Sequence, residues 1–141
     1  MTDTVVEHWI DGASAPGSSD RTAPVHDPAK GIVAKQVRLA SAADVDAAVA
    51  AASRAFAGWG RTSVAKRQQV MFAFRQLLDE RKQELAELIT AEHGKVLSDA
   101  LGEIARGLEV VELACGVGVL TKGEYTSNAS TGIDVYTVRQ P

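Results

Sequence analysis

The pattern of apolar and polar residues divides the chain into a strand-rich start, a helical middle and a strand-forming end. In the first part, Asp11-Gly12 predicts a hairpin turn, since this pair favours the backbone conformation of such turns. Residues 13–23 are small and polar and predict a loop. The run Asp-Pro-Ala-Lys-Gly at 27–31 predicts a tight turn, and the β-branched residues of 32–39 then predict a hairpin.

Helices are predicted from Ser41 to about Leu120, because apolar residues recur at spacings of three and four. Ser41 and Asp44 have the spacing of a helix-capping box, and Gly58-Trp59-Gly60 predicts the end of that first helix. Ser63 predicts the next start, and His93-Gly94 predicts another end. The apolar stripes are Val45, Val49, Ala52 and Phe56; Met71, Phe74 and Leu78; Leu85, Leu88 and Ile89; and Leu97, Leu101, Ile104, Leu108, Val111 and Cys115.

The last of these helices carries a second stripe, formed by Gly102, Arg106, Val110, Leu113 and Val117. A helix that is apolar on two faces is typically covered from more than one side. Gly102 and Gly107 each lower helix propensity by up to about 1 kcal/mol relative to alanine, which indicates close approach by another backbone or a ligand.

The end of the chain is unusual for a complete domain. Residues 127–132 are polar, residues 133–138 alternate like a strand, and the sequence stops at Gln140-Pro141. The two-faced helix also needs more partners than this chain supplies. We therefore expect the opening piece of a larger α/β protein, here mostly helical with an N-terminal β-hairpin and a C-terminal strand.

Composition narrows the function classes. The 141 residues are 45% apolar and 23% charged with a net charge of -3, which is typical of one globular domain. A mildly acidic chain without a basic stripe is a poor partner for nucleic acid or an anionic membrane. No apolar run is long enough to span a bilayer, and residues 1–7 lack a targeting pattern. We expect a cytoplasmic protein.

No complete catalytic constellation is visible in the sequence. Cys115, the one cysteine, continues an apolar stripe and is predicted to be a small buried residue. His8, His26 and His93 are scattered and lack metal-ligand spacing. The run Gly116-Val-Gly118 with Gly123 misplaces the third glycine of a dinucleotide fingerprint, and no strand precedes it.

Arg106 has two interpretations. The spacing favours an ion pair with Glu103 or Glu109, each three residues away. The alternative is an anion clamp, because a guanidinium on a mostly apolar stripe flanked by glycine can grip a planar carboxylate with two hydrogen bonds. Burial of an unpaired charge is very costly, so a buried Arg106 must find an anion.

Four segments have a distinctive combination of residues, namely His8–Gly12, Asp27–Gly31, Ala47–Phe56 with Trp59, and Glu92–Lys95. Together they resemble the N-terminal part of the NAD-dependent aldehyde dehydrogenase superfamily. Three further segments are similar to the CoA-acylating methylmalonate-semialdehyde dehydrogenases, namely Arg67–Val70, Leu88–Thr90 and Arg106–Glu112. The resemblance covers essentially the whole chain, although Asp27 replaces the more usual asparagine before Pro-Ala.

The resemblance implies an enzyme that oxidises an aldehyde through a cysteine thiohemiacetal and transfers hydride to NAD. Coenzyme A then takes the acyl group, so that methylmalonate semialdehyde yields propionyl-CoA and carbon dioxide. The catalytic cysteine, the oxyanion-stabilising asparagine and the NAD-binding helix are implied to follow Pro141, and Cys115 does not match the nucleophile. This chain is therefore expected to hold no catalytic residue, no cofactor-binding residue, no metal and no bound cofactor.

One site residue is implied by the resemblance, because Arg106 matches the arginine that holds the substrate carboxylate. The implied parts are N-terminal strands at 1–40, the helical part of the NAD-binding domain at 41–120, and the start of the oligomerisation-arm strands at 121–141. The arm, matched by 124–139, implies a homo-oligomer, either a dimer or a tetramer.

Two alternatives stay open. The chain belongs either to another semialdehyde dehydrogenase that releases a free acid, or to a complete, non-catalytic helical interaction module. If the chain is the opening part of a CoA-acylating dehydrogenase, we expect the isolated chain to lack dehydrogenase activity and to self-associate through exposed apolar helix faces.

Overall fold

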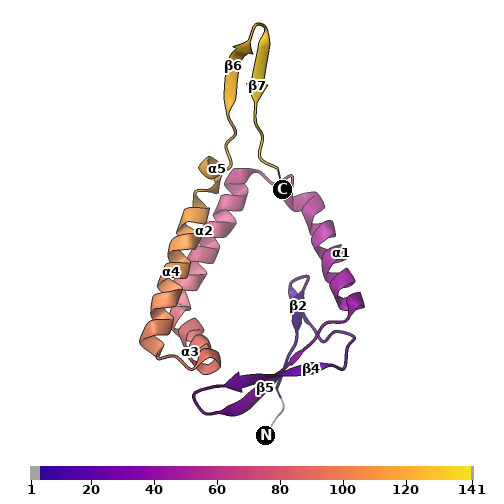
Figure 1. Ribbon diagram of the computed structural model, residues 1–141, viewed down its shortest axis with the longest axis vertical. Helices are drawn as coiled ribbons and strands as arrows, with labels where there is room; N and C mark the ends of the chain where they lie inside the picture. The colour runs from indigo at the N-terminus through magenta and orange to yellow at the C-terminus, as the bar shows by residue number, and fades with distance from the viewer. Residues whose placement is uncertain (1–3, 141) are drawn as a thin grey trace. The chain divides into compact units, whose positions relative to one another are not determined.

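A computed structural model describes residues 4–140, which form two compact units. The first unit contains the described residues up to Thr62 together with Lys82–Ile104. The second contains Ser63–Arg81 and the described residues from Ala105 onward. Figure 1 gives the order of the elements along the chain.

The first unit begins with two hairpins. Strands β2 (His8–Ile10) and β3 (Ala13–Ala15) pair antiparallel across Asp11 and Gly12, whose φ values of 56° and 77° confirm the predicted turn. Strands β4 (Thr22–Asp27) and β5 (Ile32–Arg38) pair antiparallel across the predicted tight turn. Strand β1 (Val5–Val6) adds to the other edge of β5 in parallel, so the sheet order is β1-β5-β4.

Helix α1 (Ala42–Trp59) follows β5 and has the predicted capping box. The Asp44 backbone N–H donates to Ser41 Oγ at 3.2 Å, and the Ser41 backbone N–H donates to Asp44 Oδ2 at 2.8 Å. These hydrogen bonds, and others from Ser18, lower the pKa of Asp44 to about 2. Helix α3 (Lys82–His93) ends at Gly94, as predicted, where φ is 80°.

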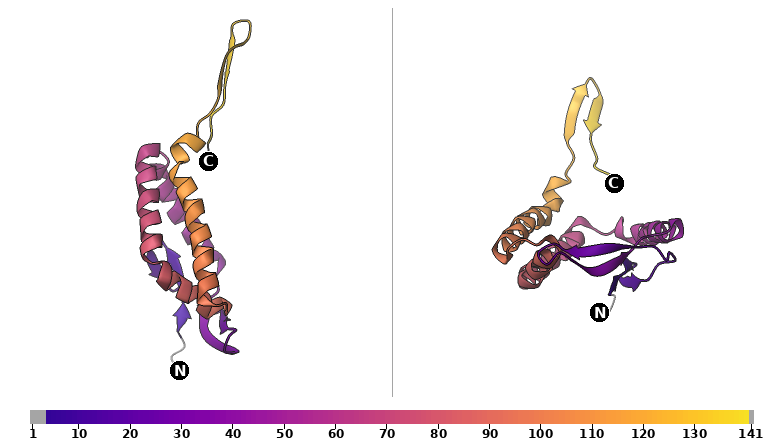
Figure 2. Two further views of the ribbon diagram at one scale, coloured as in Figure 1. Left: turned by 90° about the vertical axis from the view of Figure 1, so that its left-hand side faces the viewer. Right: turned by 60° about the horizontal axis from the view of Figure 1, so that its bottom comes forward.

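The second unit is built from α2 (Val64–Glu80), the C-terminal part of α4 (Leu97–Cys115), the short α5 (Val117–Leu120) and a hairpin. Ser63 caps α2 as predicted, because its side chain accepts from the Lys66 backbone N–H. The hairpin pairs β6 (Tyr125–Ser130) with β7 (Ile133–Tyr136), and in Figures 1 and 2 it extends away from α5.

Few side chains are buried in either unit. The buried apolar residues of the first unit are all alanines, Ala51, Ala86 and Ala100, and those of the second are Leu108 and Cys115. Many large apolar side chains are exposed, including the predicted α1 stripe of Val45, Val49 and Phe56. Residues 4–140 therefore leave much of their apolar helix surface without cover.

Two details of the sequence prediction are wrong. The predicted loop at 13–23 contains β3 and the start of β4. The second stripe of α4 stops at Leu113, because the helix ends at Cys115 and Val117 begins α5. Gly107 has open space where a Cβ atom would lie, so none of residues 4–140 approaches it closely, and close approach by a ligand or another part of the enzyme stays a prediction.

Candidate functional site

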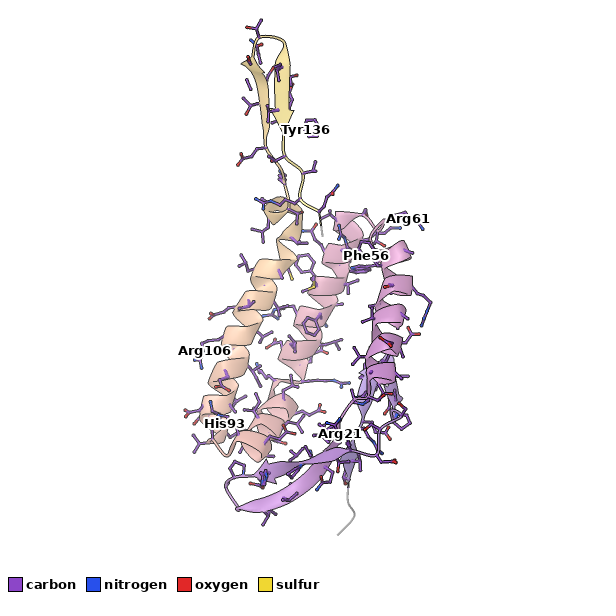
Figure 3. The ribbon with its side chains drawn as sticks, turned by 45° about the vertical axis from the view of Figure 1, so that its right-hand side comes forward. Arg21, Phe56, Arg61, His93, Arg106 and Tyr136 are labelled. Atoms are coloured by element: carbon purple, nitrogen blue, oxygen red, sulfur yellow. The ribbon has the colours of Figure 1, made fainter. Side chains whose placement is uncertain are left out.

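Arg106 lies on the side of α4 that points away from α2. Glu112 of α4 pairs with Arg75 of α2, and Leu108 is buried, so these positions mark the inner face. At about 100° per residue, Arg106 is about 160° from Leu108 around the helix axis. Figure 3 shows the Arg106 side chain on this outer face, where it is exposed.

The predicted ion pair of Arg106 is absent. Glu103 instead pairs with Lys95, whose side chain is only 18% exposed. Within the described residues, no carboxylate lies close enough to Arg106 for an ion pair. The guanidinium is therefore free to receive an anion, and no internal contact has to be broken first.

Arg106 has apolar neighbours on one side of the outer face and the exposed Glu109, three residues further on, on its other side. Val110 and Leu113, which follow it by one and two turns, are 67% and 66% exposed. Exposed apolar side chains beside a cationic group are unusual for a fully solvated helix face, which is mostly polar. This outer face, formed by Arg106, Val110 and Leu113, can hold a ligand that combines a carboxylate with an apolar part.

The inner face of α4 is joined to α2 by a charged cluster. The Nε and Nη2 atoms of Arg75 both donate to Glu112 Oε1, at 2.9 and 2.7 Å, and Nη1 donates to Asp79 Oδ2 at 3.4 Å. The hydrogen bond to Glu112 is the main cause that raises the pKa of Arg75. Sequence analysis did not find this pair, because 37 residues separate its members and no local spacing signals such a contact.

Cys115 is buried at the last residue of α4, which confirms the prediction of a small buried side chain. Its backbone carbonyl accepts a hydrogen bond from the Gln68 side-chain amide at 2.9 Å. This bond satisfies one of the carbonyl groups that a helix leaves unpaired at its C-terminus, and it ties the end of α4 to α2.

The glycines after Cys115 do not form a dinucleotide cradle. Gly116 and Gly118 flank the start of α5 and follow a helix, and a Cβ atom on Gly118 would lie 2.8 Å from Gln68 Oε1. The space beside Gly118 is thus filled by a side chain of the same unit. These residues do not fit a bound pyrophosphate, which needs a strand-to-turn-to-helix backbone with open space beside the glycines.

The three histidines remain apart from one another. His8 is partly buried with Nε2 unpaired, while His26 and His93 are exposed on β4 and at the end of α3. Across residues 4–140, no three His, Cys, Asp or Glu side chains come together in a way that could hold a metal ion. Among residues 4–140, no helix is long and apolar enough to cross a bilayer.

The sequence profile of the aldehyde dehydrogenase family matches residues 15–141. The chain belongs to this family. A methylmalonate-semialdehyde/malonate-semialdehyde dehydrogenase of Rattus norvegicus, named as acylating and mitochondrial, is 43% identical over 136 residues, which are 96% of this chain and 25% of that protein. Malonate-semialdehyde dehydrogenase 1 of Geobacillus kaustophilus is 43% identical over 98% of this chain and 28% of its own length.

Solved structures of aldehyde dehydrogenases have the same fold over this segment. A protein of Sinorhizobium meliloti, named as a methylmalonate-semialdehyde dehydrogenase and complexed with NAD, superposes with a TM-score of 0.93 at 43% identity, over 100% of this chain and 29% of its own. A methylmalonate-semialdehyde dehydrogenase of Oceanimonas doudoroffii superposes with a TM-score of 0.91 at 43% identity, over 98% of this chain and 28% of its own. The chain thus spans between a quarter and a third of the length of these aldehyde dehydrogenases.

Proposed function

We propose that this segment belongs to an NAD-dependent, CoA-acylating methylmalonate-semialdehyde dehydrogenase. The proposed reaction converts methylmalonate semialdehyde, NAD and coenzyme A to propionyl-CoA, carbon dioxide and NADH. The observation that carries this proposal is the 43% identity over nearly the whole chain to dehydrogenases named for this substrate or for malonate semialdehyde.

The role proposed for Arg106 is to bind the substrate carboxylate. Its exposure and its lack of an ion-pair partner within the described residues support this role. A semialdehyde carries a carboxylate as well as the reacting carbonyl, so a second charged anchor orients the carbonyl for attack. The same anchor discriminates against aldehydes that lack the charge.

The segment itself is proposed to be inactive. Residues 4–140 present no nucleophile on the outer face of α4, the buried Cys115 lies at the other side of that helix, and the glycines at 116 and 118 do not fit a dinucleotide. Both NAD and coenzyme A would therefore be held by parts of the enzyme other than the segment described above.

A homo-oligomer, either a dimer or a tetramer, is proposed for the whole enzyme. The β6–β7 hairpin supports this proposal, because its strands pair only with each other among the described residues. Its apolar side chains Ile133, Val135 and Tyr136 are exposed, and Figure 3 shows Tyr136 on the hairpin. An exposed two-stranded edge is a ready partner for another strand.

The proposal is tested with the longest natural chain that carries this segment. Formation of NADH is followed with methylmalonate semialdehyde in the presence and absence of coenzyme A, and the product is identified by mass spectrometry. Propionyl-CoA formed in proportion to NADH is the expected product. If that chain forms no NADH from any semialdehyde, the proposal is wrong and a non-catalytic module is favoured.

The second candidate is a dehydrogenase that releases a free acid from another semialdehyde. An aldehyde dehydrogenase of Physcomitrella patens, solved in complex with its reaction product succinate, is 25% identical over 94% of this chain with a TM-score of 0.78, which favours keeping this candidate. The same assay separates the two, since a free acid formed at a rate independent of coenzyme A identifies the second.

A further inference from the structure

Two directional contacts join α2 to the C-terminal part of α4 among the described residues: the Arg75–Glu112 ion pair, and the hydrogen bond from the Gln68 side-chain amide to the Cys115 backbone carbonyl. The carbonyl lies close to the helix axis, so the Arg75–Glu112 pair, which holds a side chain of α4, is the contact that bears on rotation of the helix. The other inner positions on that part of α4 are Leu108, Val111 and Cys115, whose apolar side chains pack without a preferred direction. Apolar packing alone allows a helix to rotate slightly about its axis. A guanidinium that donates twice to one carboxylate oxygen resists that rotation, because the planar fork requires a fixed approach.

A small rotation of α4 is amplified at Arg106. Side-chain tips lie about 5 to 6 Å from a helix axis, so a rotation of about 20° moves them by about 2 Å. Arg106 and Glu112 project from the same rigid helix, on sides about 120° apart. Fixing the direction of Glu112 therefore also fixes the direction of Arg106.

We propose that Arg75 and Glu112 form a positioning pair that sets the rotation of α4 and thereby aims Arg106 at the substrate carboxylate. The inference rests on the proposed function, because it requires that Arg106 holds that carboxylate. Neither member of the pair touches the substrate. The partial exposure of the pair, 36% for Arg75 and 49% for Glu112, indicates that its contribution is to direction more than to stability.

The experiment uses the full natural chain and two aldehydes. Methylmalonate semialdehyde carries the carboxylate, and 2-methylpropanal replaces it by a methyl group. In the variant Glu112→Gln, kcat/KM for the charged aldehyde should fall by about tenfold through a higher KM, since a displacement of 1 Å can cost about a hundredfold. The value for 2-methylpropanal should stay unchanged. Arg75→Lys keeps both charges but loses the planar fork of the guanidinium. Its kcat/KM for the charged aldehyde should lie between those of wild type and Glu112→Gln.

Glu80→Gln is the matched control, because Glu80 is an exposed carboxylate on α2 that accepts a hydrogen bond from Gln76 in the same helix. This control variant should leave kcat/KM unchanged for both aldehydes. Its midpoint of thermal unfolding should match that of Glu112→Gln. If Glu112→Gln lowers kcat/KM equally for both aldehydes, the pair is merely structural and the inference is wrong. An unchanged value for both overturns it as well.

Arg106→Ala separates this inference from the function on which it rests. If Arg106→Ala abolishes the preference for the charged aldehyde while Glu112→Gln does not alter it, only the positioning role fails. If Arg106→Ala leaves the preference intact in an active enzyme, the role proposed for Arg106 fails and the positioning role fails with it. Should Glu112→Gln not fold, Arg75→Lys carries the same test.

Discussion

Replacing Gly94 by alanine should destabilise the protein by about 2 to 5 kcal/mol. Gly94 ends α3 with a φ of 80°, in the left-handed region that side chains with a Cβ atom rarely adopt. An added Cβ atom would also lie 2.9 Å from Cγ of Pro28 and 3.3 Å from the backbone nitrogen of Ala29. Both neighbours belong to the tight turn between β4 and β5.

The magnitude has two parts. The left-handed backbone costs an alanine about 1 to 2 kcal/mol. The contact with Pro28 adds about 1 to 3 kcal/mol, which is typical of an extra methyl group forced into a packed position, because the proline ring cannot swing aside as a long side chain can. The two parts act on the same substitution, so their sum gives the expected loss in the free energy of unfolding.

Gly31→Ala isolates the backbone part. Gly31 has a φ of 67° but nothing within 4 Å of an added Cβ atom. Urea unfolding of the purified protein should therefore show a loss of about 1 to 2 kcal/mol for Gly31→Ala. The loss for Gly94→Ala should exceed it by about 1 to 3 kcal/mol. Equal losses for the two variants would refute the packing of α3 against the turn.

Four further outcomes are expected. Arg106→Ala should lower kcat/KM for a carboxylate-bearing semialdehyde by about tenfold to a hundredfold, because one charged hydrogen-bonded contact is lost. In the same steady-state assay, kcat/KM for neutral aldehydes should stay unchanged. Wild type and Asp44→Asn should differ in free energy of unfolding by a constant amount above the ordinary carboxyl pKa of 3.8. The difference should shrink as the pH falls toward the lowered pKa of about 2, and urea unfolding at a series of acidic pH values measures it. The isolated segment should self-associate in light scattering, whereas a monodisperse monomer would contradict the exposed apolar faces. Gly123→Ala should speed amide hydrogen exchange in β6, because the new methyl group would overlap the carbonyl oxygen of Thr137 at the base of the hairpin.

The turns and helix ends could be predicted from sequence because their chemistry is local. Asp11-Gly12 occupies a two-residue hairpin turn, Ser41 and Asp44 complete a capping box, and Gly94 takes the left-handed conformation that ends α3. In each case a few neighbouring residues determine the backbone, so no knowledge of distant contacts is required.

The strand β6 could not be predicted in this way. Both faces of β6 are exposed, and its residues do not alternate between apolar and polar as those of β7 do. The Asp134 side chain of β7 instead accepts hydrogen bonds from the Tyr125 hydroxyl and the Asn128 backbone N–H, which lower its pKa. Such a strand is specified by its partner across the hairpin, and sequence periodicity carries no signal of it.

The stripe that contains Arg106 illustrates what a sequence pattern can and cannot establish. The pattern correctly placed Arg106, Val110 and Leu113 on one face, because helix periodicity requires it. It also favoured an ion pair of Arg106 with Glu103 or Glu109. Glu103 instead pairs with Lys95, a residue outside the helix whose position no helix spacing can predict, and the described residues show no ion pair between Arg106 and Glu109. An arginine whose nearest acidic neighbour is already engaged has to obtain its anion from elsewhere once the face is covered, since an unpaired buried charge is too costly. An engaged Glu103, a Glu109 that does not pair with Arg106, and the exposed apolar side chains of Val110 and Leu113 are therefore together a stronger argument for an incoming carboxylate than the presence of the arginine alone.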